Sequence, residues 1–223
     1  KGLNADIEWI SELRKYFPVV GLGMNIPSCP IPQVVFDDIG SGIIAVEELY
    51  KKGHRKIAFI NIHPWHKMFI SRSLGYMQAC KQLGIYKPDY LIEFPEQPAC
   101  TEPDKVPPNC EASLDFLLSM QDRPTAVICA NDWAAAGFYQ ACNKKGMDIP
   151  NDFSVLGFDD IGDLCHVLTP ALSSIAMPFT DCGKVATSLL IDLVEPQKSF
   201  ILNTASIQCL AGRVKIRDSV VSI

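Results

Sequence analysis

The sequence has no excess of basic residues. Its 223 residues contain 20 Lys and Arg against 25 Asp and Glu, which gives a formal net charge of -5. A surface that binds nucleic acid directly normally carries clustered Lys and Arg. The nearest basic cluster, KKGHRK at residues 51–56, lies where a helical pattern ends at Gly53, and cations there complement a helix C-terminus. We therefore expect that this segment does not itself contact DNA.

Long apolar runs and paired cysteines are also missing. No apolar stretch approaches the roughly 18 residues that cross a bilayer, and the start, KGLNADIEWI, lacks the apolar region of a signal peptide. Nine cysteines are scattered without any CxxC pair, mostly inside apolar runs such as AVICAND. This pattern is typical of reduced, buried thiols and not of a disulfide framework. We expect a soluble, cytoplasmic protein with no membrane partner.

The motifs of common enzyme classes are absent as well. The sequence has no GxSxG, no P-loop and no Cys beside a well-placed His. The stretch GLGMNI at Gly21 begins like a dinucleotide-binding loop but lacks the third glycine and runs into Pro27. His63 and His66 have HxxH spacing, yet they lie in a Pro-containing loop without the Glu of a zinc-protease helix. We therefore predict no catalytic residue, no metal site and no cofactor.

What the sequence does contain is a regular alternation. Its hydrophobic content of 48% is enough for the core of one large or two small domains. Short β-branched runs alternate with amphipathic stretches, which is typical of parallel sheets covered by helices. Residues 95–110 hold five prolines and several acids and are expected to form a surface loop. Strands are expected at 18–23, 33–36, 56–62, 90–94, 125–130 and 153–158, with β-like runs at 200–210 and 213–216; helices are expected from Asn4 to before Pro18, from about 38 to 53, and over 67–84, 111–120, 132–145 and 180–193.

The pentapeptide FDDIG occurs twice, at residues 36–40 and 158–162, each time at the end of an apolar run. The flanking sequences do not align, so the two copies do not indicate a duplicated fold. In parallel sheets, ligands bind outside the carboxyl ends of the strands. The candidate site residues are therefore the polar ones that follow the expected strands: Asp37 and Asp38, residues 61–72, residues 131–133, and Asp159 and Asp160.

Six stretches of this sequence, taken together, resemble the effector-binding domain of the LacI/GalR family of transcription regulators. The resemblance implies the α/β fold of the type I periplasmic-binding proteins, which has two doubly wound parallel-sheet lobes, three crossovers and an interlobe cleft. It assigns residues 1–36 and 178–210 to the N-terminal lobe and residues 37–177 and 211–219 to the C-terminal lobe. The family's opening strands and helices are lacking, so the first lobe is expected to be incomplete. The stretches are GHRKIAFI at 53, SRSLGY at 71, PTAVICANDWAAAG at 124, IPNDFSVLGFDDI at 149, LTPALSSIAMPFTDCGKVATSLL at 168 and RVKIRDS at 213.

The resemblance also implies ligand-binding residues in the C-terminal lobe. Arg72 matches the arginine that grips sugar hydroxyls, Asp159 the carboxylate anchor, and Asn131 the amide after the preceding strand. Trp133 matches a variable position that often contacts ligand, although it is equally compatible with a plain helix residue. Asp132 is expected to cap the helix that follows it.

Three further positions match the places where the family's lobes join. Phe36 and Phe179 match apolar or aromatic positions there, and are compatible with either a core role or a ligand contact. Asp37 matches an aspartate at the crossover into the second lobe. We therefore interpret the first FDDIG copy as part of a hinge and a helix start, and the second as part of a ligand site.

These residue types suit a sugar on chemical grounds alone. A carboxylate accepts hydrogen bonds from two neighbouring hydroxyls, a guanidinium donates a fork of two, and an amide does both. An aromatic ring covers the apolar C–H face of the sugar. The function implied is that of an effector sensor for a monosaccharide or derivative, acting as a homodimer on operator DNA through a helix-turn-helix module outside this segment. Two alternatives are a solute-binding protein of a transport system and a sugar or nucleotide hydrolase that uses one of the aspartate pairs.

Overall fold

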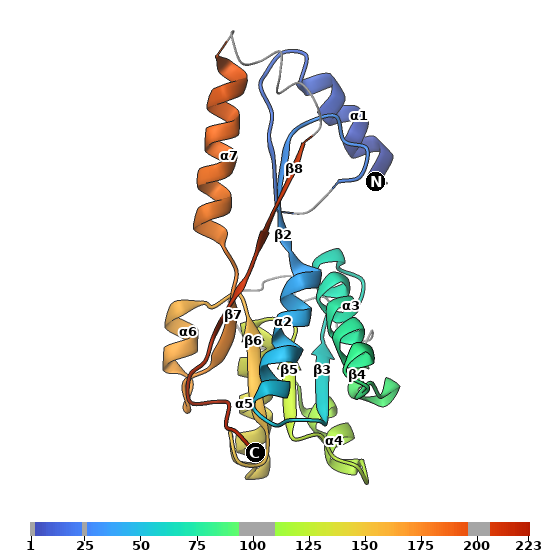
Figure 1. Ribbon diagram of the computed structural model, residues 1–223, viewed down its shortest axis with the longest axis vertical. Coiled ribbons are helices and arrows are strands. Elements are labelled where there is room, and N and C mark those ends of the chain that lie inside the picture. The colour runs from blue at the N-terminus through green and yellow to red at the C-terminus, as the bar shows by residue number, and fades with distance from the viewer. Residues whose placement is uncertain (1–2, 24–25, 94–109, 196–205) are drawn as a thin grey trace. The chain divides into compact units, whose positions relative to one another are not determined.

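The computed structural model describes residues 3–23, 26–93, 110–195 and 206–223. The chain divides into two compact units: unit 1 comprises Lys1–Asp37 and Pro178–Ala211, and unit 2 comprises Asp38–Met177 and Gly212–Ile223. The chain therefore passes from one unit to the other three times. Each unit contains a sheet of mainly parallel strands (Figure 1), and together these features confirm the predicted fold class.

In the part that the structure describes, unit 1 is a three-stranded parallel sheet with two helices. Its strand order is β1-β2-β8, and its small core joins Val34 of the central strand to Cys182 and Leu189 of helix α7. The strand expected at residues 18–23 is shorter in the structure, because only its last three residues pair with β2. The elements are α1 (Leu3–Leu13), β1 (Gly21–Gly23), β2 (Gln33–Asp37), α7 (Phe179–Val194) and β8 (Ile207–Ala211).

Unit 2 is a six-stranded sheet with the order β4-β3-β5-β6-β7-β9. All neighbouring strands are parallel except the edge strand β9, which runs antiparallel to β7. Strands β3, β5 and β6 are fully buried, as their continuous apolar sequences predict. The elements are α2 (Asp38–Lys51), β3 (Ile57–Asn61), α3 (Lys67–Gln82), the 3-10 turn η1 (Pro88–Tyr90), β4 (Leu91–Glu93), α4 (Glu111–Ser119), β5 (Ala126–Cys129), α5 (Asp132–Lys145), β6 (Ser154–Phe158), α6 (Gly162–Val167), β7 (Ser173–Ala176) and β9 (Arg213–Lys215).

Most expected elements of unit 2 agree with the structure within a few residues. Gly146 ends α5 in the left-handed conformation, as a C-terminal glycine should. Helix α6 was not expected, because six residues are too few to show a helical period. Most of the expected loop at 95–110 lies outside the described residues. Seven cysteines are buried free thiols, whereas Cys209 is exposed and Cys100 lies outside the described part.

Helices α2 and α3 pack side by side through a pair of glycines (Figure 1). A Cβ added at Gly42 would lie 2.3 Å from the carbonyl oxygen of Arg72, and one at Gly75 would lie 2.1 Å from that of Ile39. Neither oxygen can move without shifting a helix backbone. The two glycines therefore bring the helices close together and bring Arg72 of α3 near the start of α2.

We expect Gly75→Ala to destabilise the protein by about 1–3 kcal/mol, because the added methyl must push the two helix backbones apart. Gly183→Ala is the matched control, since Gly183 is also in a helix and a Cβ there would meet nothing within 4 Å. The control should be neutral or up to about 1 kcal/mol more stable. Urea unfolding of both variants measures the difference, and equal effects would contradict the close-packing argument.

Candidate functional site

The carboxyl ends of the unit 2 strands bring several of the expected site residues to one edge of the sheet. The chain leaves β3 for β4 on one side and returns to β5 on the other, so the strand order switches between β3 and β5. Ligands of open parallel sheets bind at such a switch point. Asn61 ends β3, Asn131 follows β5, and Asp159 follows β6.

Arg72 of α3 lies at this edge, and its side chain is completely buried. Its Nε donates to Asp38 Oδ1 at 3.0 Å, its Nη1 to the Ala130 carbonyl oxygen at 2.7 Å, and its Nη2 to Asp159 Oδ1 at 2.8 Å. The guanidinium also lies over the Phe158 ring, with Cζ 4.7 Å from its centroid. A buried cation needs such partners, because an unpaired charge away from water is very costly.

Both FDDIG copies therefore contribute a carboxylate to the same arginine. Asp38 comes from the first copy and Asp159 from the second. Our interpretation of the copies as two separate sites was incomplete for this reason. Asp38 is among the candidates from the sequence, but we interpret it there as part of a helix start, because an acid at the first position of a helix is ordinary. Only the packing of α2 against α3 brings it to Arg72. Asp159 keeps 15% of its side-chain surface exposed, so it is the partner of Arg72 that a ligand can also reach.

The second acid of the later copy has a different role. Asp160 accepts from Lys215 Nζ at 2.5 Å and from Arg217 Nη2 at 2.6 Å, and its backbone N–H donates to Ser174 Oγ at 3.1 Å. The two cations hold the pKa of Asp160 below its usual value, although partial burial acts the other way. Asp160 is thus an anchor of the turn and is not solvent-exposed.

The start of α5 corrects one expectation. Asn131 is the N-cap, because its Oδ1 accepts from the Ala134 N–H at 2.8 Å. Asp132 was expected to be the cap, but it is fully buried and its carboxylate points to other elements. Burial raises its pKa to about 6 against the opposing effect of its hydrogen bonds. Trp133 lies half-buried in the first turn of α5.

The loop after β3 carries a cluster of aromatic rings. The His63 ring centroid lies 5.4 Å from that of Trp65 and 5.6 Å from that of Phe69, and His66 lies 5.3 Å from Phe69. The Phe69 ring centroid in turn lies 5.7 Å from Arg72 Cζ, so the cluster adjoins the buried arginine. Burial, followed by the neighbouring His66, lowers the pKa of His63 and favours its neutral form. Among the residues that the structure describes, no group of three or more His, Cys, Asp or Glu could hold a metal ion.

Phe36 and Phe179, the two remaining expected contacts, lie in unit 1. Their rings meet edge to face, with centroids 5.1 Å apart. Phe36 packs against the small core of unit 1, whereas half of the Phe179 surface is exposed at the start of α7. This pair therefore combines a core residue with an exposed aromatic face.

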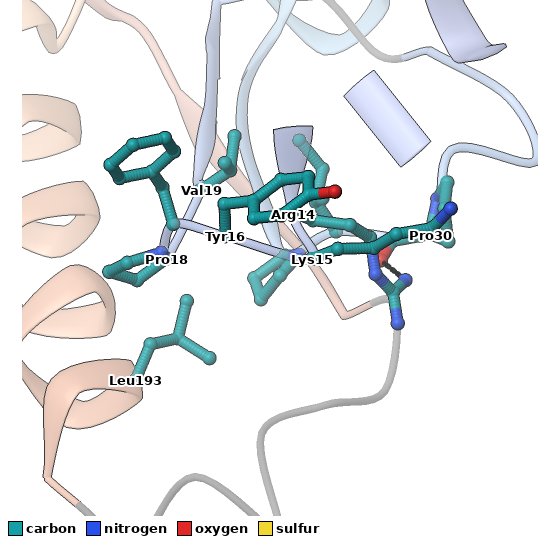
Figure 2. A pocket seen from close by; sticks show the side chains of 10 residues that line it. Arg14, Lys15, Tyr16, Pro18, Val19, Pro30 and Leu193 are labelled. Atoms are coloured by element: carbon teal, nitrogen blue, oxygen red, sulfur yellow. Dashed lines mark hydrogen bonds between the residues drawn. The ribbon is translucent and has the colours of Figure 1, made fainter. Parts of the chain in front are cut away.

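Two pockets are lined by none of these residues. A pocket of about 230 Å³ in unit 1 lies between the segment after α1, the Pro30–Pro32 segment and Leu193 of α7; in Figure 2, Arg14 reaches the Pro30 carbonyl oxygen across it. A pocket of about 610 Å³ in unit 2 is lined by the second half of α5 and by the segments that precede β6 and β7. The latter lies at the amino edge of the sheet, opposite the candidate site.

Comparison with known proteins agrees with this geometry. Residues 46–220 match the periplasmic binding protein-like domain family. The chain is 31% identical to the HTH-type transcriptional repressor CytR of Escherichia coli (strain K12) over 191 residues, which are 84% of this chain and 52% of CytR. It is 30% identical to the ribose operon repressor of Haemophilus influenzae over 224 residues, which are 99% of this chain and 61% of that protein.

A solved structure is similar over the whole chain. The LacI family transcriptional regulator from Enterococcus faecium, crystallised with bound ribose, superposes with a TM-score of 0.77 at 26% identity, covering 100% of this chain and 76% of that one. The chain belongs to the periplasmic binding protein-like family and is similar to the effector-binding domains of LacI-family transcription regulators. It spans about half to three fifths of the length of these curated relatives. The two curated relatives are named as repressors, and the solved relative as a transcriptional regulator. Within the described residues, no helix is sufficiently long and apolar for a membrane span.

Proposed function

We propose that this chain is the sugar-sensing domain of a transcription regulator and binds its effector at the carboxyl edge of the unit 2 sheet. The observation that carries the proposal is the buried Arg72 between Asp38 and Asp159, at the point where the strand order switches. In this arrangement Arg72 is oriented before any ligand arrives. Asp159 is oriented with it and can accept from sugar hydroxyls through its exposed side.

The other expected contacts complete the proposed site. The Asn131 oxygen is used by the helix cap, so its amide nitrogen is the group available to donate to a hydroxyl oxygen. Trp133 would cover the apolar face of a sugar ring at this edge of the sheet, and within unit 1 the Phe179 ring, packed against Phe36, offers a second exposed aromatic face. We propose D-ribose as the first effector to test, because one solved relative holds ribose and one curated relative is a ribose operon repressor.

The similarity to LacI-family regulators also supports proposals about the full-length protein. We propose that a helix-turn-helix module outside this segment binds operator DNA, that the regulator acts as a homodimer, and that it works in the cytoplasm, where its DNA is. The acidic balance of this segment supports a division in which DNA contact belongs to another module.

A thermal-shift titration with D-ribose, followed by other pentoses, hexoses and nucleosides, tests the proposal. We expect a sugar to raise the melting temperature of the wild type, and Asp159→Asn to weaken its binding by about tenfold or more, because a charge-assisted hydrogen bond is lost. Asp163→Asn is the matched control, since Asp163 is an exposed acid four residues further along. Equal binding by wild type and Asp159→Asn would contradict the site, and chemical conversion of the sugar, seen by NMR, would favour the hydrolase alternative.

A further inference from the structure

The turn that carries Asp159 has an unusual backbone. Asp159 and Asp160 both have positive φ values, of 99° and 55°, although neither is glycine. Side chains other than glycine rarely adopt this region, and each such residue costs about 1–3 kcal/mol unless its surroundings hold it there. The position of the Asp159 carboxylate therefore depends on whatever holds the turn.

The Asp132 side chain holds the turn from the interior of unit 2, in addition to the ion pairs of Asp160 with Lys215 and Arg217. Its Oδ2 accepts from the backbone N–H of Ile161 at 2.8 Å, directly after the two strained residues. Its Oδ1 accepts from the Ser174 hydroxyl at 2.7 Å, and the same hydroxyl oxygen accepts from the Asp160 N–H at 3.1 Å. Asp132 thus fixes one end of the turn directly and its middle through Ser174.

Gly157 makes room for this carboxylate. A Cβ added at Gly157 would lie only 2.2 Å from Asp132 Oδ1, so any larger residue in this position of β6 would displace the carboxylate. The strand that leads into the turn is therefore shaped around Asp132. The Asp132 carboxylate contacts the turn, β7 and Cys165 of α6. The Asp132 side chain is fully buried and cannot touch a ligand.

We propose that Asp132 is a positioning residue for effector binding, which holds the turn of residues 158–161 so that Asp159 meets Arg72 and faces the ligand. This inference rests on the proposed function, because it names what orients the same site. Asp132 acts on the ligand only through Asp159 and Arg72. Its loss should therefore weaken ligand binding more than it weakens the fold.

The test compares Asp132→Asn and Ser174→Ala with the wild-type chain, using D-ribose as the probe. Asparagine keeps the size of Asp132 but replaces one of its two acceptor oxygens with an N–H₂ group, so at least one of the hydrogen bonds from Ile161, Ser174 and Cys165 is lost. We expect the Kd for D-ribose to rise by about tenfold or more in Asp132→Asn. Ser174→Ala should act in the same direction, and the double variant should show less than the sum of the two effects, because both act through one turn.

A second readout needs no ligand. The Nε and Nη protons of Arg72 are buried and hydrogen-bonded, so they should give slowly exchanging NMR signals in the wild type. We expect the Nη signals to broaden or exchange faster in both variants as Asp159 moves. Tyr139→Phe is the matched control, because it removes one hydrogen bond, to the Pro170 carbonyl oxygen, from the same helix α5. It should leave both the Arg72 signals and the Kd unchanged.

The outcomes separate this inference from the proposed function. If D-ribose and the other sugars fail to bind the wild type, the proposed function is wrong, and the Arg72 signals still decide the role of Asp132. If a sugar binds and both its Kd and the Arg72 signals are unchanged in Asp132→Asn and Ser174→Ala, the positioning role is wrong. The positioning role is also wrong if the Kd of Asp132→Asn rises no more than the Kd of the control Tyr139→Phe.

Discussion

Arg72→Ala should destabilise the protein by about 3–5 kcal/mol at neutral pH, because it leaves the buried Asp38 and the partly buried Asp159 without their shared cation. The Ala130 carbonyl oxygen loses its partner as well. Urea unfolding with wild-type and variant chains measures the loss, and the proposed sugar binding should disappear with it.

Two further variants show whether the loss comes from the buried charges. Arg72→Lys keeps the positive charge but cannot make the three directed hydrogen bonds, so we expect an intermediate loss. Arg55→Ala is the control for an exposed arginine, since Arg55 lies on the Tyr50 ring and donates to nearby carbonyls near the surface. It should change stability by less than about 1 kcal/mol. A similar loss for Arg55→Ala and Arg72→Ala would contradict the role assigned to Arg72.

Asp132 should make the stability of the protein depend on pH in the mildly acidic range. Burial raises its pKa from the ordinary value of 3.8 to about 6, so the folded state binds this proton more tightly than the unfolded state. The stabilisation that the protonated Asp132 gives the folded state is complete below about pH 4 and is lost as the pH rises through about 6. At about 1.4 kcal/mol for each tenfold change in proton affinity, the loss is about 3 kcal/mol.

Asp132→Asn isolates this effect from the other titrating groups. Asparagine cannot ionise, so wild-type stability relative to the variant should fall by about 3 kcal/mol between about pH 4 and pH 7. His54 acts in the opposite direction in both proteins, because burial lowers its pKa and the stability of its neutral form is lost on acidification. Urea unfolding at several pH values gives the difference, and a constant difference across this range would contradict an elevated pKa at Asp132.

The agreement between sequence and structure is best where local pattern and burial coincide. Continuous apolar runs such as IAFI and AVIC form fully buried strands, and the amphipathic stretches between them form helices. The agreement is poorer where the pairing of one strand with another sets the length or the sheet of an element. β1 is shorter than expected because only Gly21–Gly23 pair with β2. Strands β8 and β9, almost adjacent in sequence, belong to different sheets.

The candidate site shows the same division. Arg72, Asn131 and Asp159 lie after or beside strands that the sequence pattern predicts, and this position is enough to mark them as candidates. Their roles depend on contacts between distant elements. Asp132 and Asn131 are neighbours with similar side chains, and only the contacts with Ile161 and Ser174 show which of them caps the helix.

By itself, the sequence determined the alternation of strands and helices, the absence of enzyme and membrane signals, and the family resemblance. These properties depend on residue type, spacing and order along the chain. Only the tertiary structure decided that Asp38 and Asp159, from the two FDDIG copies, bind one buried arginine. It also decided that Asp132 shapes the turn that carries Asp159, because these contacts join residues 29 to 87 positions apart. Hydrogen bonds over such separations have no local pattern, and they depend on how closely α2 and α3 pack and on the room left at Gly157.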